Sequence, residues 1–184
     1  MDYSQKNELK VDAGLVAGGG LRTQIVLENH YKIECIRDGK VIWVEEIDNL
    51  VVTEGLNDSL DKHLKGSAYT AAWYVGLTNT TPTFAAADTM ASHAGWTENT
   101  TYDEANRQTL TLGTVSAGSV SNTASKAVFT IAGTVTIGGA FVTSVNTKGG
   151  TTGILYGGGA LSQNRSLVDN DVLNITITCT AAAA

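Results

Sequence analysis

The second half of the chain alternates between segments that suit β-strands and clusters of polar turn residues. From Gln108 onward it is rich in Val, Thr, Ala, Ser and Gly and contains no proline. β-Branched residues favour strands, whereas Ser, Asn and Gly favour turns. The expected strands span residues 109–115, 126–132, 135–145, 153–160 and 171–181, and the expected turns span residues 116–119, 121–125, 146–150 and 164–170. This pattern predicts a mainly β protein, an antiparallel β-sandwich of the jelly-roll-like kind.

Six glycines fall within residues 148–161, and such a stretch raises the question of phosphate binding. A P-loop needs its lysine after the last glycine, but Lys148 precedes them all. A dinucleotide-binding fingerprint needs a third glycine at its sixth position, where Ser162 stands instead. We therefore expect Gly149 and Gly150 to close a hairpin between the third and fourth of these strands. The glycines on its arms then allow bulges or close approach of two backbones.

The first half begins with an arm and a predicted hairpin. Residues 1–20 end in three glycines and show no sustained period, so we expect an extended N-terminal arm before a single β-sandwich domain over residues 21–184. Asp38 and Gly39 suit a two-residue turn within residues 31–46. In the resulting register the apolar side chains share one face. The expected pairs are Ile36 with Val41, Cys35 with Ile42, Glu34 with Trp43, Ile33 with Val44 and Lys32 with Glu45.

One short helix is expected after this hairpin. Thr53 can cap its first turn, and Gly66 can end it. Between them Leu56, Leu60 and Leu64 recur at intervals of four residues, which places them on one face of a helix. We expect this leucine stripe to face the core, while His63 and Asp61 fall off the stripe and lie on a solvated face.

The charge is small and unevenly distributed. The formal net charge is −6, with 12 Lys and Arg against 18 Asp and Glu, which argues against a nucleic-acid partner because phosphates attract clustered basic residues. Only five charged residues follow Arg107: Lys126, Lys148, Arg165, Asp169 and Asp171. Strands without charge or proline pair readily with other chains. We therefore expect a homo-oligomer, with a trimer as the favoured form.

The sequence also bears on the compartment in which the chain folds. It shows no N-terminal signal pattern and no apolar run of membrane-spanning length, so we expect folding in the cytoplasm and no membrane partner. Cys35 and Cys179 lie far apart and outside any Cys-x-x-Cys spacing. Buried thiols are therefore expected in place of a disulfide or a metal site.

A long loop over residues 78–106 follows the strand expected at residues 73–77 and holds most of the reactive side chains. Ser92 and His93 are adjacent, but a hydrolase would also need an orienting group and an oxyanion hole, which the sequence does not identify. Metal ligands could be drawn from Asp88, His93, Asp103 and Glu104, but they lack a recognised spacing. We therefore expect no catalytic residue, no cofactor and no metal.

The same loop contains aromatic and charged residues that suit a structural role. We expect Trp96 and Tyr102 to anchor the loop, and either Glu98 or Glu104 to pair with Arg107. An alternative is that Trp96 stacks on a sugar, since an indole ring has both an apolar face and a polar edge.

Four segments resemble, in the same order, small structural proteins of tailed-bacteriophage virions. They are residues 73–78 (WYVGLT), 87–98 (ADTMASHAGWTE), 104–107 (EANR) and 148–156 (KGGTTGILY). The resemblance covers roughly residues 50–160. It implies a non-enzymatic virion component, without catalytic residues to carry over to this chain.

Together with the arm and the uncharged half, this resemblance favours a capsid decoration or cement protein. Such a protein would assemble in the host cytoplasm, join the virion, and bind both itself and the major capsid protein or other virion proteins. The alternatives are a neck or tail structural protein and a receptor- or glycan-binding module of the virion. The side chains expected to contact partners are Leu9, Val11, Leu15 and Val16 in the arm, and Trp96.

Overall fold

The computed structural model describes residues 25–69 and 72–183. The arm expected over residues 1–20 lies outside the described residues, as do its expected contact residues Leu9, Val11, Leu15 and Val16. The elements are β1 (Ile25–Arg37), β2 (Lys40–Asp48), β3 (Leu50–Val51), α1 (Thr53–His63), β4 (Tyr74–Thr78), β5 (Glu98–Asn99), β6 (Gln108–Thr109), β7 (Ser119–Ser121), β8 (Ala127–Thr130), β9 (Val135–Thr143), β10 (Leu155–Leu167) and β11 (Val172–Ala183).

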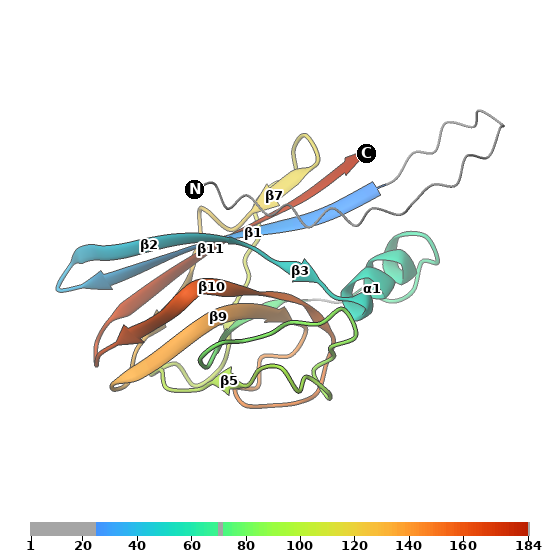
Figure 1. Cartoon of the computed structure of the whole chain (residues 1–184). Coiled ribbons are helices and arrows are strands. Elements are labelled where there is room, and N and C mark those ends of the chain that lie inside the picture. Colours follow the sequence, from blue (N-terminus) through green and yellow to red (C-terminus); the bar gives the residue numbers. More distant parts are fainter. Residues whose placement is uncertain (1–24, 70–71, 184) are drawn as a thin grey trace, which may run out of the picture.

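The strands form two antiparallel sheets that lie one above the other (Figure 1). Sheet A has the order β2-β1-β11, and both β7 and β8 pair with β11. Sheet B has the order β3-β10-β9-β4, and both β5 and β6 pair with β4. α1 lies at one end of the sandwich, the end at which β1 begins (Figure 1). The predicted mainly β sandwich with one helix is confirmed.

The main core lies between the sheets, and a smaller one lies on the other face of sheet B. Successive residues of a strand point to opposite faces, so Val142 joins the main core while Phe141 joins the smaller one. The smaller core contains Val52, Met90, Trp96, Phe141 and Leu155. The main core includes Tyr31, Ile33, Cys35, Phe129, Leu173, Ile175 and Ile177 from sheet A, and Val75, Leu77, Ile137, Leu161 and Leu167 from sheet B.

The hairpin between β1 and β2 forms at the predicted turn but contains a bulge. Asp38 and Gly39 both have positive φ, as a type I′ turn requires, and Ile36 lies opposite Val41 as predicted. The register then shifts by one residue, because one strand contributes an extra residue to a β-bulge. The predicted pairs beyond this point are wrong. The observed pairs are Cys35 with Trp43, Glu34 with Val44, Ile33 with Glu45 and Lys32 with Glu46.

The bulge reverses which side chains of β2 face inward. Ile42 and Val44 are 44% and 45% exposed, whereas Glu45 is 9% exposed. The Glu45 carboxylate accepts hydrogen bonds from Nε and Nη2 of Arg165, at 3.0 and 2.8 Å. Burial raises the pKa of Glu45, but hydrogen bonds from β10 outweigh that effect and hold it below its ordinary value. The guanidinium of Arg165 also lies over the Trp43 ring. This contact between the sheets favours the bulged register.

α1 forms where a helix was predicted, but its leucine stripe faces away from the core. Leu56, Leu60 and Leu64 are 40%, 57% and 82% exposed. Gly55 is the buried residue of the helix, and its lack of a side chain lets the helix approach the backbone of Tyr156 in β10. The prediction that the leucines face the core is therefore wrong, because the helix packs through glycine.

The ends of α1 also differ from the prediction. Val52 occupies the N-cap position without a side-chain hydrogen bond, so Thr53 is not the cap. The carboxylate of Glu54 accepts a hydrogen bond of 2.7 Å from the amide of Leu155, which ties the first turn to β10. Gly66 follows the helix with a φ of 74°, as expected for a residue that ends a helix. No helix among the described residues is long and apolar enough to cross a membrane.

The β9–β10 hairpin confirms the structural role predicted for the glycines. Gly149 in its turn has a φ of 76°, a conformation that glycine adopts without strain. In the paired strands, a side chain at Gly139 would clash with the backbone oxygen of Gly159. β10 continues to Leu167, which is fully buried. The turn predicted at residues 164–170 is therefore shorter than expected, because burial of this leucine extends the strand.

Before β8, fewer residues pair as strands than the sequence predicts. The strand expected at residues 109–115 is paired only in β6, and β7 lies where turns were expected. Leu112 and Val115 are 37% and 70% exposed. This segment therefore presents apolar side chains outside the core.

The close contact between α1 and β10 predicts a cost for enlarging Gly55. Gly55→Ala should lower the free energy of unfolding by about 1–3 kcal/mol, because the added methyl group would clash with the Tyr156 backbone, which cannot rotate away. Urea denaturation would measure the change. Gly113→Ala is the matched control, because its new methyl group would lie at an ordinary contact distance of 3.4 Å from Ser121. Equal stability of the two variants would contradict this packing.

Candidate functional site

Arg107 is a buried charge beneath the long loop. Its Nε and Nη2 donate to the two carboxylate oxygens of Glu98, at 2.9 and 2.7 Å. Its Nη1 and Nη2 also donate to the carbonyl oxygens of Val145 and Gly150, at 2.8 and 2.6 Å. The guanidinium carbon lies 5.2 Å from the centre of the Phe141 ring. Of the two predicted partners of Arg107, Glu98 is confirmed.

This network extends into the turn between β9 and β10. The Glu98 carboxylate accepts a hydrogen bond of 2.9 Å from the amide of Gly149. The Lys148 ammonium donates to the carbonyl oxygen of Tyr102 at 2.8 Å and lies 4.1 Å from the centre of its ring. Burial, followed by the nearby charge of Glu98, raises the pKa of the Tyr102 hydroxyl. The lysine next to the glycine-rich turn therefore holds the loop.

Trp96 anchors the loop on the outer face of sheet B. Its indole is 5% exposed, stacks on His93 with 3.8 Å between ring centres, and contacts the rings of Phe84 and Phe141. Its Nε1 donates to Asp88 at 3.1 Å. The predicted anchoring role is confirmed. In this structure the indole face is not accessible, so Trp96 offers no surface on which a sugar could stack.

The other reactive side chains of the loop make structural contacts. Within the described part of the chain no hydrogen bond joins Ser92 to His93, and His93 Nδ1 lies 3.0 Å from the Trp96 carbonyl oxygen. Asp88 accepts hydrogen bonds from Trp96 and from a backbone amide, while Glu104 accepts one from the amide of Thr130. No group of three His, Cys, Asp or Glu residues is placed to hold a metal ion among residues 25–69 and 72–183.

The two cysteines are free, as predicted. Cys35 is fully buried in sheet A, and Cys179 is half-buried in β11. Burial raises the pKa of each thiol to about 11. Because the thiolate is the reactive form, both cysteines are poor nucleophiles at neutral pH.

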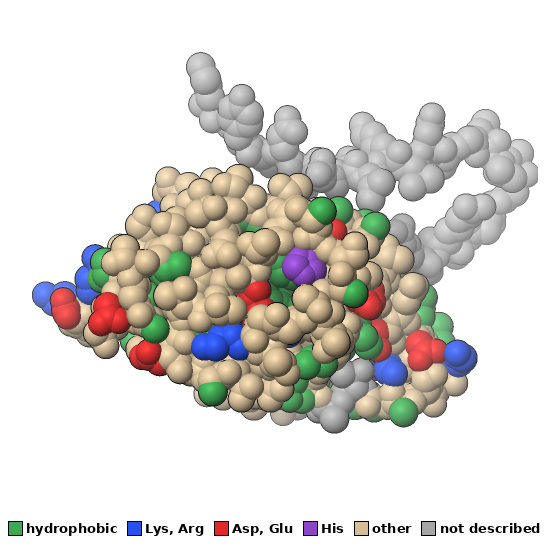
Figure 2. Space-filling model, turned by 90° about the horizontal axis from the view of Figure 1, so that it is seen from below, with side chains coloured by type: hydrophobic (Ala, Val, Ile, Leu, Met, Phe, Trp, Pro, Cys, Tyr) green, Lys and Arg blue, Asp and Glu red, His purple; other side chains and the backbone are tan. Residues whose placement is uncertain are grey.

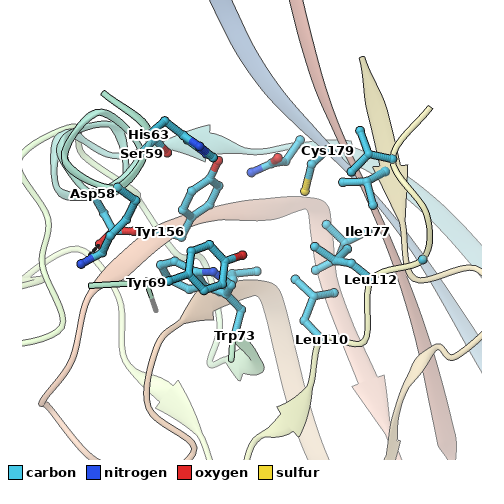
Figure 3. Close-up of a pocket in the computed structure, with 16 residues that line it drawn as sticks. Asp58, Ser59, His63, Tyr69, Trp73, Leu110, Leu112, Tyr156, Ile177 and Cys179 are labelled. Carbon is cyan, nitrogen blue, oxygen red and sulfur yellow. Dashed lines mark ion pairs between the residues drawn. The ribbon is translucent and has the colours of Figure 1, made fainter. Parts of the chain in front are cut away.

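A cavity of about 420 Å³ opens between the sheets beside α1. Figure 3 shows the helix residues Asp58, Ser59 and His63 on one side of it, and Leu110, Leu112 and Ile177 on the other. Tyr156 and Trp73 lie between these two sides, with 5.2 Å between their ring centres in an edge-to-face arrangement. The remaining lining residues are Asn29, Lys62, Tyr69, Gly113, Val115, Val120, Val142 and Cys179.

The cavity has one polar wall and one apolar wall. On the helix, Lys62 lies 3.7 Å from the Asp58 carboxylate. The opposite wall is made of aliphatic side chains from β11 and from the segment that follows β6. A partly apolar cavity with a few polar groups is the usual form of a binding site. This arrangement suits an apolar group that carries hydrogen-bonding atoms.

Sequence reasoning did not find this cavity. Its lining comes from widely separated elements, and the helix was expected to turn the opposite face inward. One local signal existed, since the helical positions 55, 58, 59 and 62 hold glycine and polar residues that leave space beside a sheet. The leucine stripe predicts the opposite orientation of the helix.

Comparison of the sequence with known protein families and with curated proteins gave no match. The candidate site therefore rests on the geometry of this chain alone.

Removing the buried indole should destabilise the fold. Trp96→Ala should lower the free energy of unfolding by about 3–5 kcal/mol, because it leaves a cavity against Phe84 and Phe141. Urea denaturation would measure the loss, with His93→Ala as the control, since His93 contacts the same indole but is only half-buried. Unchanged stability together with a lost affinity for glycans would instead support the sugar-binding alternative.

The buried ion pair gives a second expectation. Arg107→Met should cost about 3–5 kcal/mol of stability, because it leaves the Glu98 carboxylate buried without its counter-charge. The double variant Arg107→Met/Glu98→Gln should be more stable than the single one. Lys65→Met removes the exposed pair with Asp61 and should cost about 0–1 kcal/mol. The single variant Glu98→Gln completes the comparison. If the loss of stability in the double variant equalled the sum of the losses in the two single variants, the coupling would be contradicted.

Proposed function

We propose that this chain is a non-enzymatic structural component of a tailed-bacteriophage virion. Its specific role is that of a capsid decoration protein that assembles with itself, as a trimer, and binds the capsid lattice. In this proposal the β-sandwich is the rigid body, and the N-terminal arm contributes to attachment.

The observation that carries the proposal is that the four virion-like segments converge in one structural network. Residues 73–78 include β4, which pairs with β5 and β9. Residues 87–98 supply Trp96 and Glu98, residues 104–107 supply Arg107, and residues 148–156 supply the turn that Arg107 and Glu98 hold. The resemblance therefore follows the residues that build this fold, as expected if the shared property is a scaffold.

The chemistry of the loop supports the same proposal. Its carboxylates, imidazole and guanidinium hold the backbone and one another, through the contacts of Asp88, His93, Glu98, Glu104 and Arg107. A catalytic group must be free to contact a substrate. Side chains that make such contacts hold the loop in one conformation, and a structural component of a particle needs a rigid fold.

The surface supports assembly with other protein chains. Figure 2 shows one face of the molecule on which charged side chains are sparse and most of the surface is polar or backbone. Among the described residues, exposed apolar side chains include Leu56, Leu60 and Leu64 at α1, Leu112 and Val115 beside the cavity, and Val41, Ile42 and Val44 on β2. Exposed apolar groups of this kind are typical of contacts between proteins.

The position and copy number on the particle test the proposal. A cryo-electron microscopy map of particles made from the genome that encodes this chain should show its density in many copies over the capsid surface. Particles from which the gene is deleted should lose that density. A few copies at the neck or tail would support the neck or tail alternative. Particles that never contain the protein would overturn the proposal.

A further inference from the structure

α1 carries an unpartnered apolar surface. Gly55 and Ser59 turn toward β10, and each leucine of the stripe lies one residue, or about 100°, further around the helix. We call Leu56, Leu60 and Leu64 the leucine ridge. Leucines aligned in this way are normally buried, because burying a leucine side chain contributes about 1.5–3 kcal/mol. In the described structure they nevertheless remain 40%, 57% and 82% exposed.

The cavity lies directly beside the leucine ridge. His63, which is three residues from Leu60, lines the cavity together with Ser59, so the ridge and the cavity meet along one edge of α1. On the far side of the cavity Leu112 and Val115 are 37% and 70% exposed. A single apolar segment that enters the cavity could therefore also cover the ridge.

Asn29 supplies an independent sign of a missing partner. Its side chain is 3% exposed, lines the cavity, and its Nδ2 donates to no atom in the described residues. A buried amide without a partner costs about 1–3 kcal/mol. Because Nδ2 is itself buried, a backbone carbonyl oxygen that enters the cavity would satisfy it once the Asn29 side chain turns toward the opening. The occupant should therefore combine apolar side chains with peptide groups.

The chain itself has such a segment at the right place. Asn29 is only four residues from Ile25, where β1 begins, which corresponds to about 13 Å of extended chain. The chain that precedes Ile25 is therefore attached within about 13 Å of a residue that lines the cavity. Leu15 is ten residues before Ile25, or about 33 Å of extended chain, and the three glycines at positions 18–20 allow a reversal between them.

We propose that residues 9–16 of the N-terminal arm bind this surface, with their leucine and valine side chains in the cavity and along the leucine ridge. The proposal rests on the contact role given to the arm, but it does not depend on a place in the virion. It assigns the arm a docking site on the β-sandwich, where Asn29 pairs with its backbone. The arm then shields apolar surface that would otherwise face solvent.

Disulfide trapping in the purified full-length protein tests this docking. In a Cys179→Ala background, Leu15→Cys is combined with Leu112→Cys, which lies in the apolar wall of the cavity. The matched control combines Leu15→Cys with Val44→Cys, since Val44 is equally apolar and 45% exposed but lies on the outer face of sheet A. Under mild oxidation the first pair should form a disulfide about tenfold faster than the control, because docking raises the effective concentration of the arm.

A second measurement does not depend on new cysteines. Deletion of residues 1–20 should increase the fluorescence of an added apolar dye such as anilinonaphthalene sulfonate, because it uncovers the leucine ridge and the cavity. Circular dichroism would verify that the β-sandwich remains folded. A disulfide within one chain or between two chains supports the proposal equally, and a denaturing gel separates the two cases.

Three results would overturn it. The first is equal oxidation rates for the cavity pair and the control pair. The second is unchanged dye fluorescence in a folded protein that lacks residues 1–20. The third is efficient cross-linking of two copies through Leu60→Cys alone, without trapping of Leu15→Cys, since a second β-sandwich would then cover the ridge. If the Leu15→Cys/Leu112→Cys disulfide forms as expected but the protein does not bind capsids, only the virion role is contradicted. The two proposals can therefore be tested separately.

Discussion

The bidentate pair between Arg107 and Glu98 is the constraint on which the packing of the long loop against sheet B depends. Both side chains are almost fully buried, and a charge without a partner is expensive in such surroundings. Arg107 also holds two carbonyl oxygens in and beside the β9–β10 turn, while Glu98 holds the amide of Gly149. The pair therefore joins the long loop to the hairpin of sheet B. The buried charges specify one arrangement of loop and turn.

The elements that the sequence predicted well are those set by neighbouring residues. The turns at Asp38–Gly39 and Gly149–Gly150 depend on conformations that few residues adopt, so composition alone locates them. The register beyond the first turn depends on the contact of Glu45 with Arg165, 120 residues away in sequence. The face of α1 likewise depends on how closely Gly55 can approach Tyr156. Such contacts exist only after the sheets have formed.

The same distinction explains what could be predicted of the candidate site. Trp96 lies close in sequence to Asp88 and His93, which it contacts, and its anchoring role was expected. Glu98 was one of two expected partners of the nearby Arg107. The cavity requires Asn29, Tyr156 and Leu112 to meet from β1, β10 and the segment after β6, and no local pattern specifies that meeting. The leucine periodicity identified a helix correctly but not its orientation, because either the domain itself or another segment can bury an apolar stripe.

The Arg107 network and the cavity beside α1 differ in how completely their buried polar atoms are hydrogen-bonded. The side chains of Arg107 and Glu98 are paired with each other and with backbone groups of the β9–β10 hairpin. Four buried side-chain atoms lack partners within the described residues, on Asn29, Asn49, Thr78 and Tyr102, and only Asn29 lines the cavity beside α1. There the unpaired amide coincides with exposed leucines and an aliphatic wall. Burial of a leucine and pairing of an amide both stabilise a fold. Exposed leucines beside an unpaired amide are therefore best explained by a segment that covers the leucines and accepts a hydrogen bond from the amide.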